Sequence, residues 1–319
     1  MTDVLSVEDL HIWYDAEGGD PVHAVRGVTL SLGAGDRLGL VGESGSGKTT
    51  AMMGIAGLLP SSAAVGGSVR LLGDEILRTG AAGIGPHRWR DIAIVFQGAM
   101  NAFSPVQTIG SQLVEPLELL GLAKGSAATA RVAEMLELVG VNPTAANRFP
   151  HELSGGMRQR AAIAMALVCG PKFLIADEPT TALDVMVQAQ ILELLRRLAT
   201  DMSLTLVLIS HDLAMVSEVC DRIAVMYGGQ VIEDAPTRSV FDAPQHPYTR
   251  MLLTATPDID DDVTPVSIPG APPRLDQPIA GCSFAPRCPS RFEPCGELAP
   301  LLQFRTPSHV RCHLYAEPA

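Results

Sequence analysis

Residues 42–49 read Gly-Glu-Ser-Gly-Ser-Gly-Lys-Thr, and they directly follow the apolar run Arg37–Val41. The stretch has the pattern of a P-loop, and its neighbours predict a buried strand before it and a helix from about Lys48 onward. The glycines let backbone N–H groups converge on phosphate oxygens, while the helix N-terminus and the Lys48 ammonium add positive charge. We therefore predict an α/β P-loop fold that binds a nucleoside triphosphate, with the Thr49 hydroxyl as a Mg²⁺ ligand.

Three more apolar runs predict strands of a parallel sheet that is buried on both faces. The runs are Asp91–Phe96, Phe173–Ala176 and Thr205–Ile209. They lead into Gln97, into Asp177 and Glu178, and into His211. Because open parallel sheets bind ligands at the carboxyl ends of their strands, we expect these side chains at one edge with the P-loop. Asp177 is predicted to hold Mg²⁺, and Glu178 to polarise the attacking water as general base.

Turn signals and helical patterns complete the predicted core. The predicted turns are Gly73-Asp74, between Ser68–Leu72 and Glu75–Leu77, and Gly228-Gly229, between Ala224–Tyr227 and Gln230–Glu233. Ser111–Leu122 and Ala127–Val139 look helical, with no strand signal between them, so we predict a helical insertion at about 98–160. The predicted fold class is α/β: a RecA-like parallel sheet core, an antiparallel β element, a helical insertion and a small Cys-rich C-terminal extension.

The charge balance excludes one broad class of function. The 319 residues include 23 Lys and Arg against 35 Asp and Glu, a net charge of −12, whereas a general nucleic-acid binder needs clustered Lys and Arg for phosphate contacts. No apolar run is long enough for a transmembrane helix, and the N-terminus MTDVLSVEDL lacks the basic and apolar stretches of a signal peptide. We therefore predict a cytosolic location and no nucleic-acid partner.

Four of the six cysteines crowd the last 40 residues, with the spacing C-x5-C-x6-C-x16-C. They are Cys282, Cys288, Cys295 and Cys312. In a reducing cytosol such a group indicates a metal site before it indicates disulfides. Four thiolates suit either a [4Fe–4S] cluster or zinc, and the absence of tight CxxC pairs disfavours zinc. Unliganded or disulfide-bonded cysteines remain the third alternative.

A fifth motif, Leu153-Ser154-Gly155-Gly156-Met157, lies between Gln97 and Asp177. With it the chain resembles the nucleotide-binding subunits of ABC transporters, whose signature is LSGGQ-like; here Met157 replaces the usual Gln. The resemblance covers about residues 4–255. It rests on one order of motifs: the P-loop, Gln97, the signature, Asp177-Glu178, Ala182-Leu183-Asp184 and His211.

The resemblance implies that two ATPase domains pair head to tail with ATP between them. The positions that it assigns to ATP in cis are Tyr14, Gly42, Ser44, Gly45, Ser46, Gly47, Lys48, Thr49 and Thr50, with Thr49, Gln97 and Asp177 around Mg²⁺. Ser154, Gly155 and Gly156 would reach the ATP held by the partner, and Asp184 would couple the two sites. Glu178 and His211 are the implied catalytic residues. Tyr14 is expected to stack on adenine; the alternative is a core tyrosine.

A narrower resemblance concerns the tail. Pro244–Arg250 reads PQHPYTR, like the end of the ATPase domain in dipeptide, oligopeptide and nickel importers. Their extension carries an arm like Ile268–Pro273 and a Cys-bearing stretch like Gly281–Pro289, and both are present. We therefore predict an ATPase domain at 1–255 and an importer-type extension at 256–319.

The two resemblances together imply an intact, hydrolytically competent ATPase that powers import of peptides or related small solutes. The implied partners are two membrane permeases, a second ATPase that is a paralogue rather than another copy, and, indirectly, an extracellular solute-binding protein. The implied location is the cytoplasmic face of the membrane, and the implied extra cofactor is a [4Fe–4S] cluster on the four cysteines. The alternatives are a permease-free ABC ATPase in cofactor assembly and a metal or redox sensor that uses the Cys tail.

Overall fold

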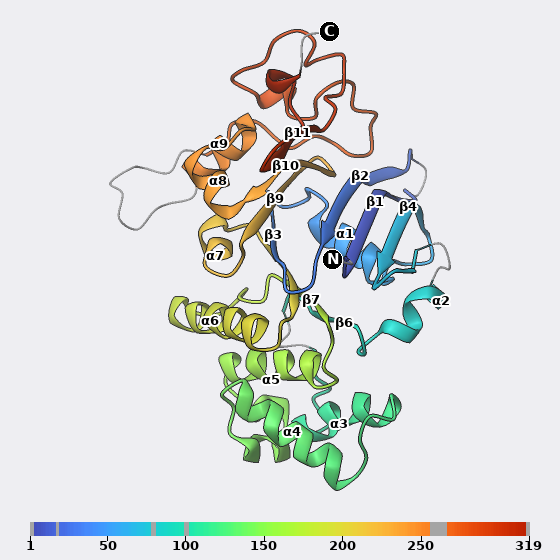
Figure 1. Cartoon of the computed structure of the whole chain (residues 1–319), viewed down its shortest axis with the longest axis vertical. Coiled ribbons are helices and arrows are strands. Elements are labelled where there is room, and N and C mark those ends of the chain that lie inside the picture. Colours follow the sequence, from blue (N-terminus) through green and yellow to red (C-terminus); the bar gives the residue numbers. More distant parts are fainter. Residues whose placement is uncertain (1–2, 17–18, 78–80, 99–101, 256–266, 317–319) are drawn as a thin grey trace. The chain divides into compact units, whose positions relative to one another are not determined.

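The computed structural model describes residues 3–16, 19–77, 81–98, 102–255 and 267–316 of the chain. It divides into two compact units, each drawn in Figure 1. The first consists of Met1–Gly33, Arg37–Gly83 and Ile209–Ala319, and the second of Ala34–Asp36 and Ile84–Leu208. The predicted boundaries near 98 and 255 adjoin residues 99–101 and 256–266, which lie outside the described residues, so these boundaries stay predictions.

The first unit contains the expected antiparallel element. Its strands, in spatial order, are β2 (Val22–Leu32), β1 (Leu5–Tyr14), β4 (Ala63–Leu71) and β5 (Asp74–Glu75). The predicted turn was one residue off, because Asp74 already pairs with Leu71 in the sheet. The turn residues are Leu72 and Gly73, with φ of 53° and 92°, as a two-residue turn between twisted strands requires. The predicted strand Glu75–Leu77 is correspondingly wrong, since β5 ends at Glu75.

The first unit also contains five neighbouring strands of a second sheet, in the order β11-β12-β10-β9-β3. They are β3 (Arg37–Val41), β9 (Arg222–Tyr227), β10 (Gln230–Pro236), β11 (Gln303–Arg305) and β12 (Ser308–Val310). β3 and β9 are parallel, and Gly228-Gly229 forms the predicted hairpin turn between β9 and β10. The tail, red in Figure 1, extends the sheet because Glu233 of β10 pairs with Val310 of β12. This addition had no clear signal in the sequence.

The first unit also contains several short helices. The helices of the first unit are α1 (Lys48–Ile55), α7 (Leu213–Ser217), α8 (Thr237–Asp242) and α9 (Pro247–Ala255). β3 and α7 approach so closely that a Cβ on Gly39 would lie 2.0 Å from Val216 Cγ1. The short helix α2 (Ala81–Ile84) follows β5 in the chain. The predicted helix start at Lys48 and the predicted strand at Arg37–Val41 are confirmed.

The second unit has the strand order β8-β7-β6, with helices α3 to α6. These elements are β6 (Ile92–Val95), α3 (Ile109–Leu119), α4 (Ser126–Leu138), α5 (Gly155–Leu167), β7 (Phe173–Asp177), α6 (Val185–Asp201) and β8 (Thr205–Ser210). β6 and β7 are parallel, and every residue of β7 is buried, as a strand covered on both faces should be. The two helices predicted at Ser111–Leu122 and Ala127–Val139 are confirmed as α3 and α4, shown in green in Figure 1.

A ring stack on β1 and β2 contains a histidine with a lowered pKa. Trp13 stacks on His11 and on His23, with ring centroids 5.3 and 4.6 Å away, and His11 Nδ1 lies 2.9 Å from His23 Nε2. Burial lowers the pKa of His23 to about 4, and the nearby charges of His11 and Arg26 add to this effect. Because the unfolded chain protonates this imidazole more readily, stability is retained above the ordinary histidine pKa and falls as the pH drops from about 6.5 to about 4.

His23→Gln is therefore expected to flatten the loss of thermal stability between pH 7 and about pH 4.5. The measurement is the unfolding midpoint across that pH range for both proteins. His151→Gln, a substitution at an exposed histidine, is the matched control and should retain the wild-type slope. Equal pH slopes for wild type and His23→Gln would contradict the assignment.

Candidate active site

The P-loop lies between β3 and α1, and its path requires glycine at two positions. Gly42 has φ of 150° and Gly47 has φ of 100°. A Cβ on Gly42 would lie 2.2 Å from the Met226 carbonyl oxygen, and one on Gly47 would lie 2.6 Å from the Ala24 carbonyl oxygen. Backbone atoms cannot move away cheaply, so these glycines fix the loop against β9 and β2.

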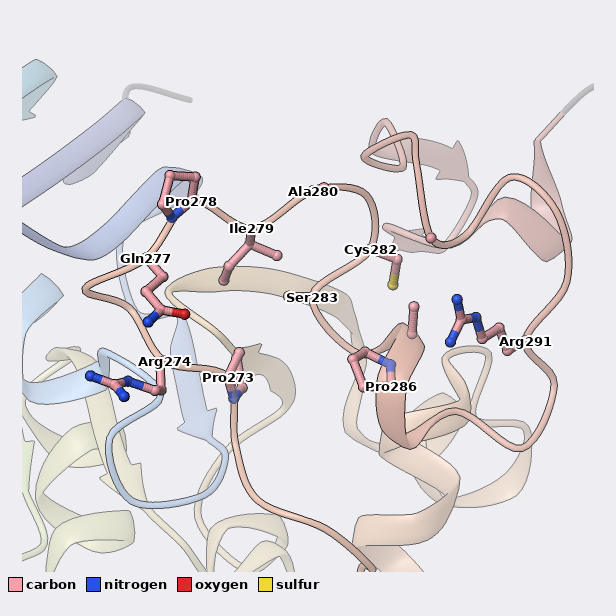
Figure 2. A pocket seen from close by; sticks show the side chains of 12 residues that line it. Pro273, Arg274, Gln277, Pro278, Ile279, Ala280, Cys282, Ser283, Pro286 and Arg291 are labelled. Atoms are coloured by element: carbon pink, nitrogen blue, oxygen red, sulfur yellow. The ribbon is translucent and has the colours of Figure 1, made fainter.

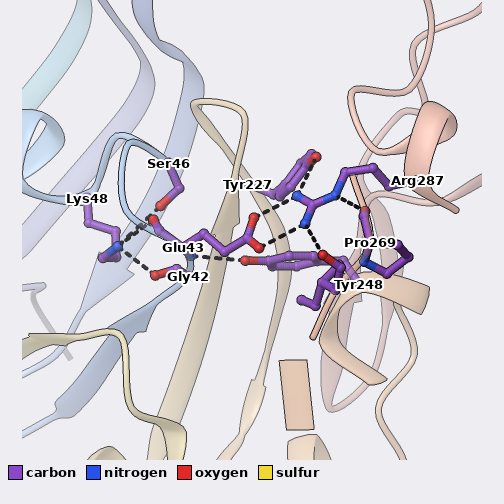
Figure 3. A network of polar contacts seen from close by, with 9 residues as sticks. Gly42, Glu43, Ser46, Lys48, Tyr227, Tyr248, Pro269 and Arg287 are labelled. Carbon is purple, nitrogen blue, oxygen red and sulfur yellow. Dashed lines mark hydrogen bonds and ion pairs between the residues drawn. The ribbon is translucent and has the colours of Figure 1, made fainter. Parts of the chain in front are cut away.

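The Lys48 ammonium lies inside the loop, as Figure 3 shows. Its Nζ donates to the carbonyl oxygens of Gly42 and Glu43 at 2.7 and 2.9 Å, and to Ser46 Oγ at 3.3 Å. The side chain is buried and belongs to the first turn of α1, beside the half-buried Thr49. A full positive charge is thus held next to the N–H groups of a helix N-terminus, an arrangement that suits a phosphate anion.

The second unit brings together two residues predicted at strand ends. Gln97 follows β6 and Glu178 follows β7, and Gln97 Nε2 donates to Glu178 Oε2 at 2.7 Å. Thr181 Oγ1 donates to the same carboxylate oxygen at 3.0 Å. The two donors hold the carboxylate in one orientation. Glu178 has φ of 43°, a left-handed backbone that is costly for glutamate and is concentrated at functional sites in proteins.

The signature segment lines a cavity of about 350 Å³ in the second unit. Ser154 caps α5 by accepting from the Met157 N–H at 3.3 Å, and Asp184 caps α6 by accepting from the Val187 N–H at 3.0 Å. A Cβ on Gly156 would lie 2.9 Å from Val187 Cγ1, so the absent side chain lets the two helix starts approach. Two helix N-termini therefore open onto one cavity, which is a suitable place for an anionic group.

The predicted site residues divide between the two compact units. In the first unit are Tyr14, Gly42, Ser44, Gly45, Ser46, Gly47, Lys48, Thr49, Thr50 and His211. In the second unit are Gln97, Ser154, Gly155, Gly156, Asp177, Glu178 and Asp184. Tyr14 is half-buried at the end of β1, His211 is exposed after β8, and Asp177 is buried at the end of β7.

The four clustered cysteines line one cavity of the first unit, and all are thiols. Burial raises the pKa of Cys282 and Cys288 and raises that of Cys312 to about 11, and the neighbouring cysteines add to the rise at these three positions. Among the described residues, no group of three or more His, Cys, Asp or Glu side chains is placed to hold a metal ion. The four thiols share one cavity of the extension.

His246 lines the same cavity, a position that no local sequence pattern indicates. It is only 1% exposed, and burial lowers its pKa to about 3, so it is neutral at physiological pH. The Tyr248 N–H donates to His246 Nδ1 at 3.0 Å, so the proton of the neutral ring is on Nε2. That Nε2 has no hydrogen-bond partner among the described residues. The cavity is thus lined by four sulfurs and one buried N–H donor that lacks an acceptor.

Cys282 also lines a second cavity of the extension, about 320 Å³ in volume. Figure 2 shows Arg274, Gln277, Cys282 and Arg291 around it. Cys282 therefore borders both cavities.

Two residues outside the predicted site contact the P-loop. Tyr248 Oη accepts from the Glu43 N–H at 3.0 Å, and Arg287 pairs with the Glu43 carboxylate at 2.7 Å (Figure 3). Both belong to stretches that resemble the importer tail, but the contacts span more than 200 residues of sequence, beyond the reach of local pattern. Among the residues described, no helix is long and apolar enough to cross a membrane.

Two known families match the chain. Residues 25–181 match the family described as ABC transporter, and residues 232–295 match the oligopeptide/dipeptide transporter C-terminal region. The chain is 43% identical over 328 residues to the dipeptide transport ATP-binding protein DppD of Bacillus subtilis, covering 100% of this chain and 97% of that protein. It is 44% identical over 312 residues to the oligopeptide transport ATP-binding protein OppD of Escherichia coli, covering 97% and 92%.

Solved structures agree with this relationship. The dimeric ATP-binding cassette MJ0796 in a post-hydrolysis state with ADP and Pi superposes with a TM-score of 0.65 at 28% identity, over 73% of this chain and 99% of that one. The cbiO1 subunit of a Clostridium perfringens ABC transporter complex gives 0.64 at 28% identity, over 76% and 92%. By its sequence over nearly its whole length and by its fold, this chain belongs to the ABC transporter ATP-binding subunits of the oligopeptide/dipeptide transporter family.

Proposed function

We propose that this chain binds and hydrolyses ATP to power import of peptides, or related small solutes, through separate membrane subunits. The observation that carries the proposal is the full-length similarity to peptide transport ATP-binding proteins, which includes the C-terminal extension. The contact between Gln97 and Glu178 and the Lys48-filled P-loop supply the chemistry that such a subunit needs.

In this proposal the first unit binds the nucleotide. Lys48 and the P-loop N–H groups hold the β- and γ-phosphates, and Tyr14 stacks on adenine. The other phosphate-binding positions are Gly42, Ser44, Gly45, Ser46, Gly47, Thr49 and Thr50. Thr49, Gln97 and Asp177 would hold Mg²⁺, which would neutralise phosphate charge.

Glu178 then acts as the general base for hydrolysis. It accepts a proton from water as that water attacks the γ-phosphorus, and the bond from this phosphorus to the β–γ bridging oxygen breaks, leaving ADP and phosphate. The two donors on its carboxylate, from Gln97 and Thr181, hold it in one orientation. His211 positions the water against the γ-phosphate.

The signature cavity serves a second subunit. Ser154, Gly155 and Gly156 contact the γ-phosphate of ATP held by that subunit, and Asp184 couples the two sites. Val185 and Met186, beside this cavity, are 75% and 72% exposed, as apolar residues of an unpaired interface would be. The dimeric ATP-binding cassette that resembles this chain supports the pairing.

The proposed assembly holds two permeases and a paralogous second ATPase at the cytoplasmic face of the membrane, with a solute-binding protein acting from outside. The test is purification of a tagged chain from membranes of cells that express it natively. Two multi-spanning proteins and a second ATPase should co-purify. Recovery of the chain alone, or with cofactor-assembly proteins, would contradict the importer assignment.

We also propose that the four-cysteine cavity holds a [4Fe–4S] cluster, with Cys282, Cys288, Cys295 and Cys312 as ligands. Four thiolates are the usual ligand set of such a cluster, and these four cysteines line one cavity. The unpartnered His246 Nε2–H in the same cavity suits a sulfur acceptor. Since ATP hydrolysis has no redox step, the cluster would be structural or regulatory.

Anaerobically purified protein is therefore expected to carry about four irons per chain and the broad visible absorbance of an iron–sulfur chromophore. Cys282→Ser should lose most of both, because it removes a ligand. Cys169→Ser is the matched control, since Cys169 lies in the other unit, and it should retain them. About one zinc per chain without visible absorbance, or no metal at all, would contradict the cluster.

A further inference from the structure

The Cys-rich extension makes a partly buried ion pair with the P-loop. Arg287 lies between Cys282 and Cys288, and its side chain is 4% exposed. Nη1 donates to Glu43 Oε2 at 2.7 Å and Nη2 donates to Glu43 Oε1 at 3.0 Å, which is a two-pronged contact (Figure 3). Such parallel pairs are among the stronger and more directional hydrogen bonds of proteins.

The guanidinium is held from several sides. Its Nε donates to the Pro269 carbonyl oxygen at 2.9 Å, and its Nη2 also donates to the Ile268 carbonyl oxygen at 3.2 Å. Nη1 donates to Tyr227 Oη at 3.2 Å. Gly270, with φ of 79°, has Arg287 Cγ 3.3 Å from where its Cβ would be, so the arm folds directly over the arginine. These contacts leave the Arg287 side chain little conformational freedom.

Glu43 is fixed as firmly from the P-loop side. Its N–H donates to Tyr248 Oη at 3.0 Å, and its carbonyl oxygen accepts from Lys48 Nζ at 2.9 Å. One residue thus links the extension, helix α9 and the P-loop lysine. Its carboxylate brings a negative charge to a loop whose proposed task is to bind a polyphosphate.

We propose that Arg287 is a positioning residue for ATP: it neutralises Glu43 and holds it in place, so that the P-loop accepts the phosphates. The extension is then part of the ATP-binding machinery and not only an appendage of it. The inference rests on the proposed function, since it requires that this P-loop binds ATP.

Removing the charge of Arg287 and removing that of Glu43 should have opposite effects on ATP binding. Without Arg287 the Glu43 carboxylate repels the phosphates, whereas without the Glu43 charge the remaining guanidinium attracts them. A unit charge about 10 Å from a phosphate, at an effective dielectric constant of about 20, changes an equilibrium constant by about tenfold. A purely structural contact predicts instead that either change weakens binding.

The experiment measures the Kd of ATP for the full-length chain by calorimetry, with thermal unfolding as the check on folding. Arg287→Met is expected to raise the Kd about tenfold, and Glu43→Gln to lower it by a similar factor. The double variant should return to within about threefold of wild type. Arg287→Lys, which keeps the charge, should also stay within about threefold, so the charge is tested even where the Met variant folds poorly. Added salt should shrink the differences.

Lys48→Ala distinguishes failure of the proposed ATP binding from failure of the role proposed for Arg287. If Lys48→Ala leaves the Kd unchanged, the ATP-binding function of this P-loop is wrong. If Lys48→Ala weakens binding but Glu43→Gln also weakens it, or Arg287→Met leaves it unchanged, only the role of Arg287 is overturned.

Discussion

Replacing Glu178 by Gln lowers ATP turnover of the assembled transporter by about 10²- to 10⁴-fold, while ATP still binds. The amide cannot accept the proton that the attacking water must lose. Its shape is retained, so Gln97 and Thr181 can still donate to the side-chain oxygen that they now contact at 2.7 and 3.0 Å. The measurement is phosphate release by the assembled complex, together with the Kd of ATP for the full-length chain.

Glu193→Gln is the matched control for this change. Glu193 lies on the solvent-facing side of α6, where it pairs with Arg196 at 2.7 Å, and its neutralisation should leave turnover at the wild-type level. Wild-type phosphate release by the Glu178→Gln complex would remove Glu178 as the general base.

Lys48→Ala is expected to raise the Kd of ATP by about 10- to 100-fold, because a hydrogen bond to a charged group contributes about 1.5–3 kcal/mol. The ammonium now makes three contacts within the loop, to Gly42, Glu43 and Ser46. Phosphate oxygens would replace those acceptors. The substitution therefore removes both a contact of the loop and the charge that recognises the β- and γ-phosphates.

Lys172→Ala controls for the loss of one positive charge. Lys172 is exposed and precedes β7, at the end of the strand opposite to Glu178. Its Kd should match wild type. Equal Kd values for Lys48→Ala and wild type would mean that ATP does not bind at this loop.

The parts of the site that follow from strand ends could be predicted from the sequence. Gln97 and Glu178 are 81 residues apart, but each follows a buried apolar run, and parallel strands bring such ends together. The P-loop could also be predicted from the sequence. Its path allows no side chain at certain positions, and glycines at these positions recur with a fixed spacing.

Other parts depend on tertiary contacts that no local pattern encodes. The pairing of β12 with β10 involves a strand of only three residues, too short for a recognisable alternation. Arg287 and Glu43 are 244 residues apart, and a charged residue in a Pro-rich tail is usually solvated. His246 is buried because α9 and the extension cover it, which its neighbours in sequence do not reveal.

The most direct test of the account is ATP-driven uptake of a labelled peptide by vesicles that contain the whole assembly, with ATP supplied on the side of this chain. The account predicts that peptide accumulates only with ATP and that Glu178→Gln abolishes the accumulation, while Glu193→Gln does not. Accumulation that needs no ATP, or that persists unchanged with Glu178→Gln, would contradict it.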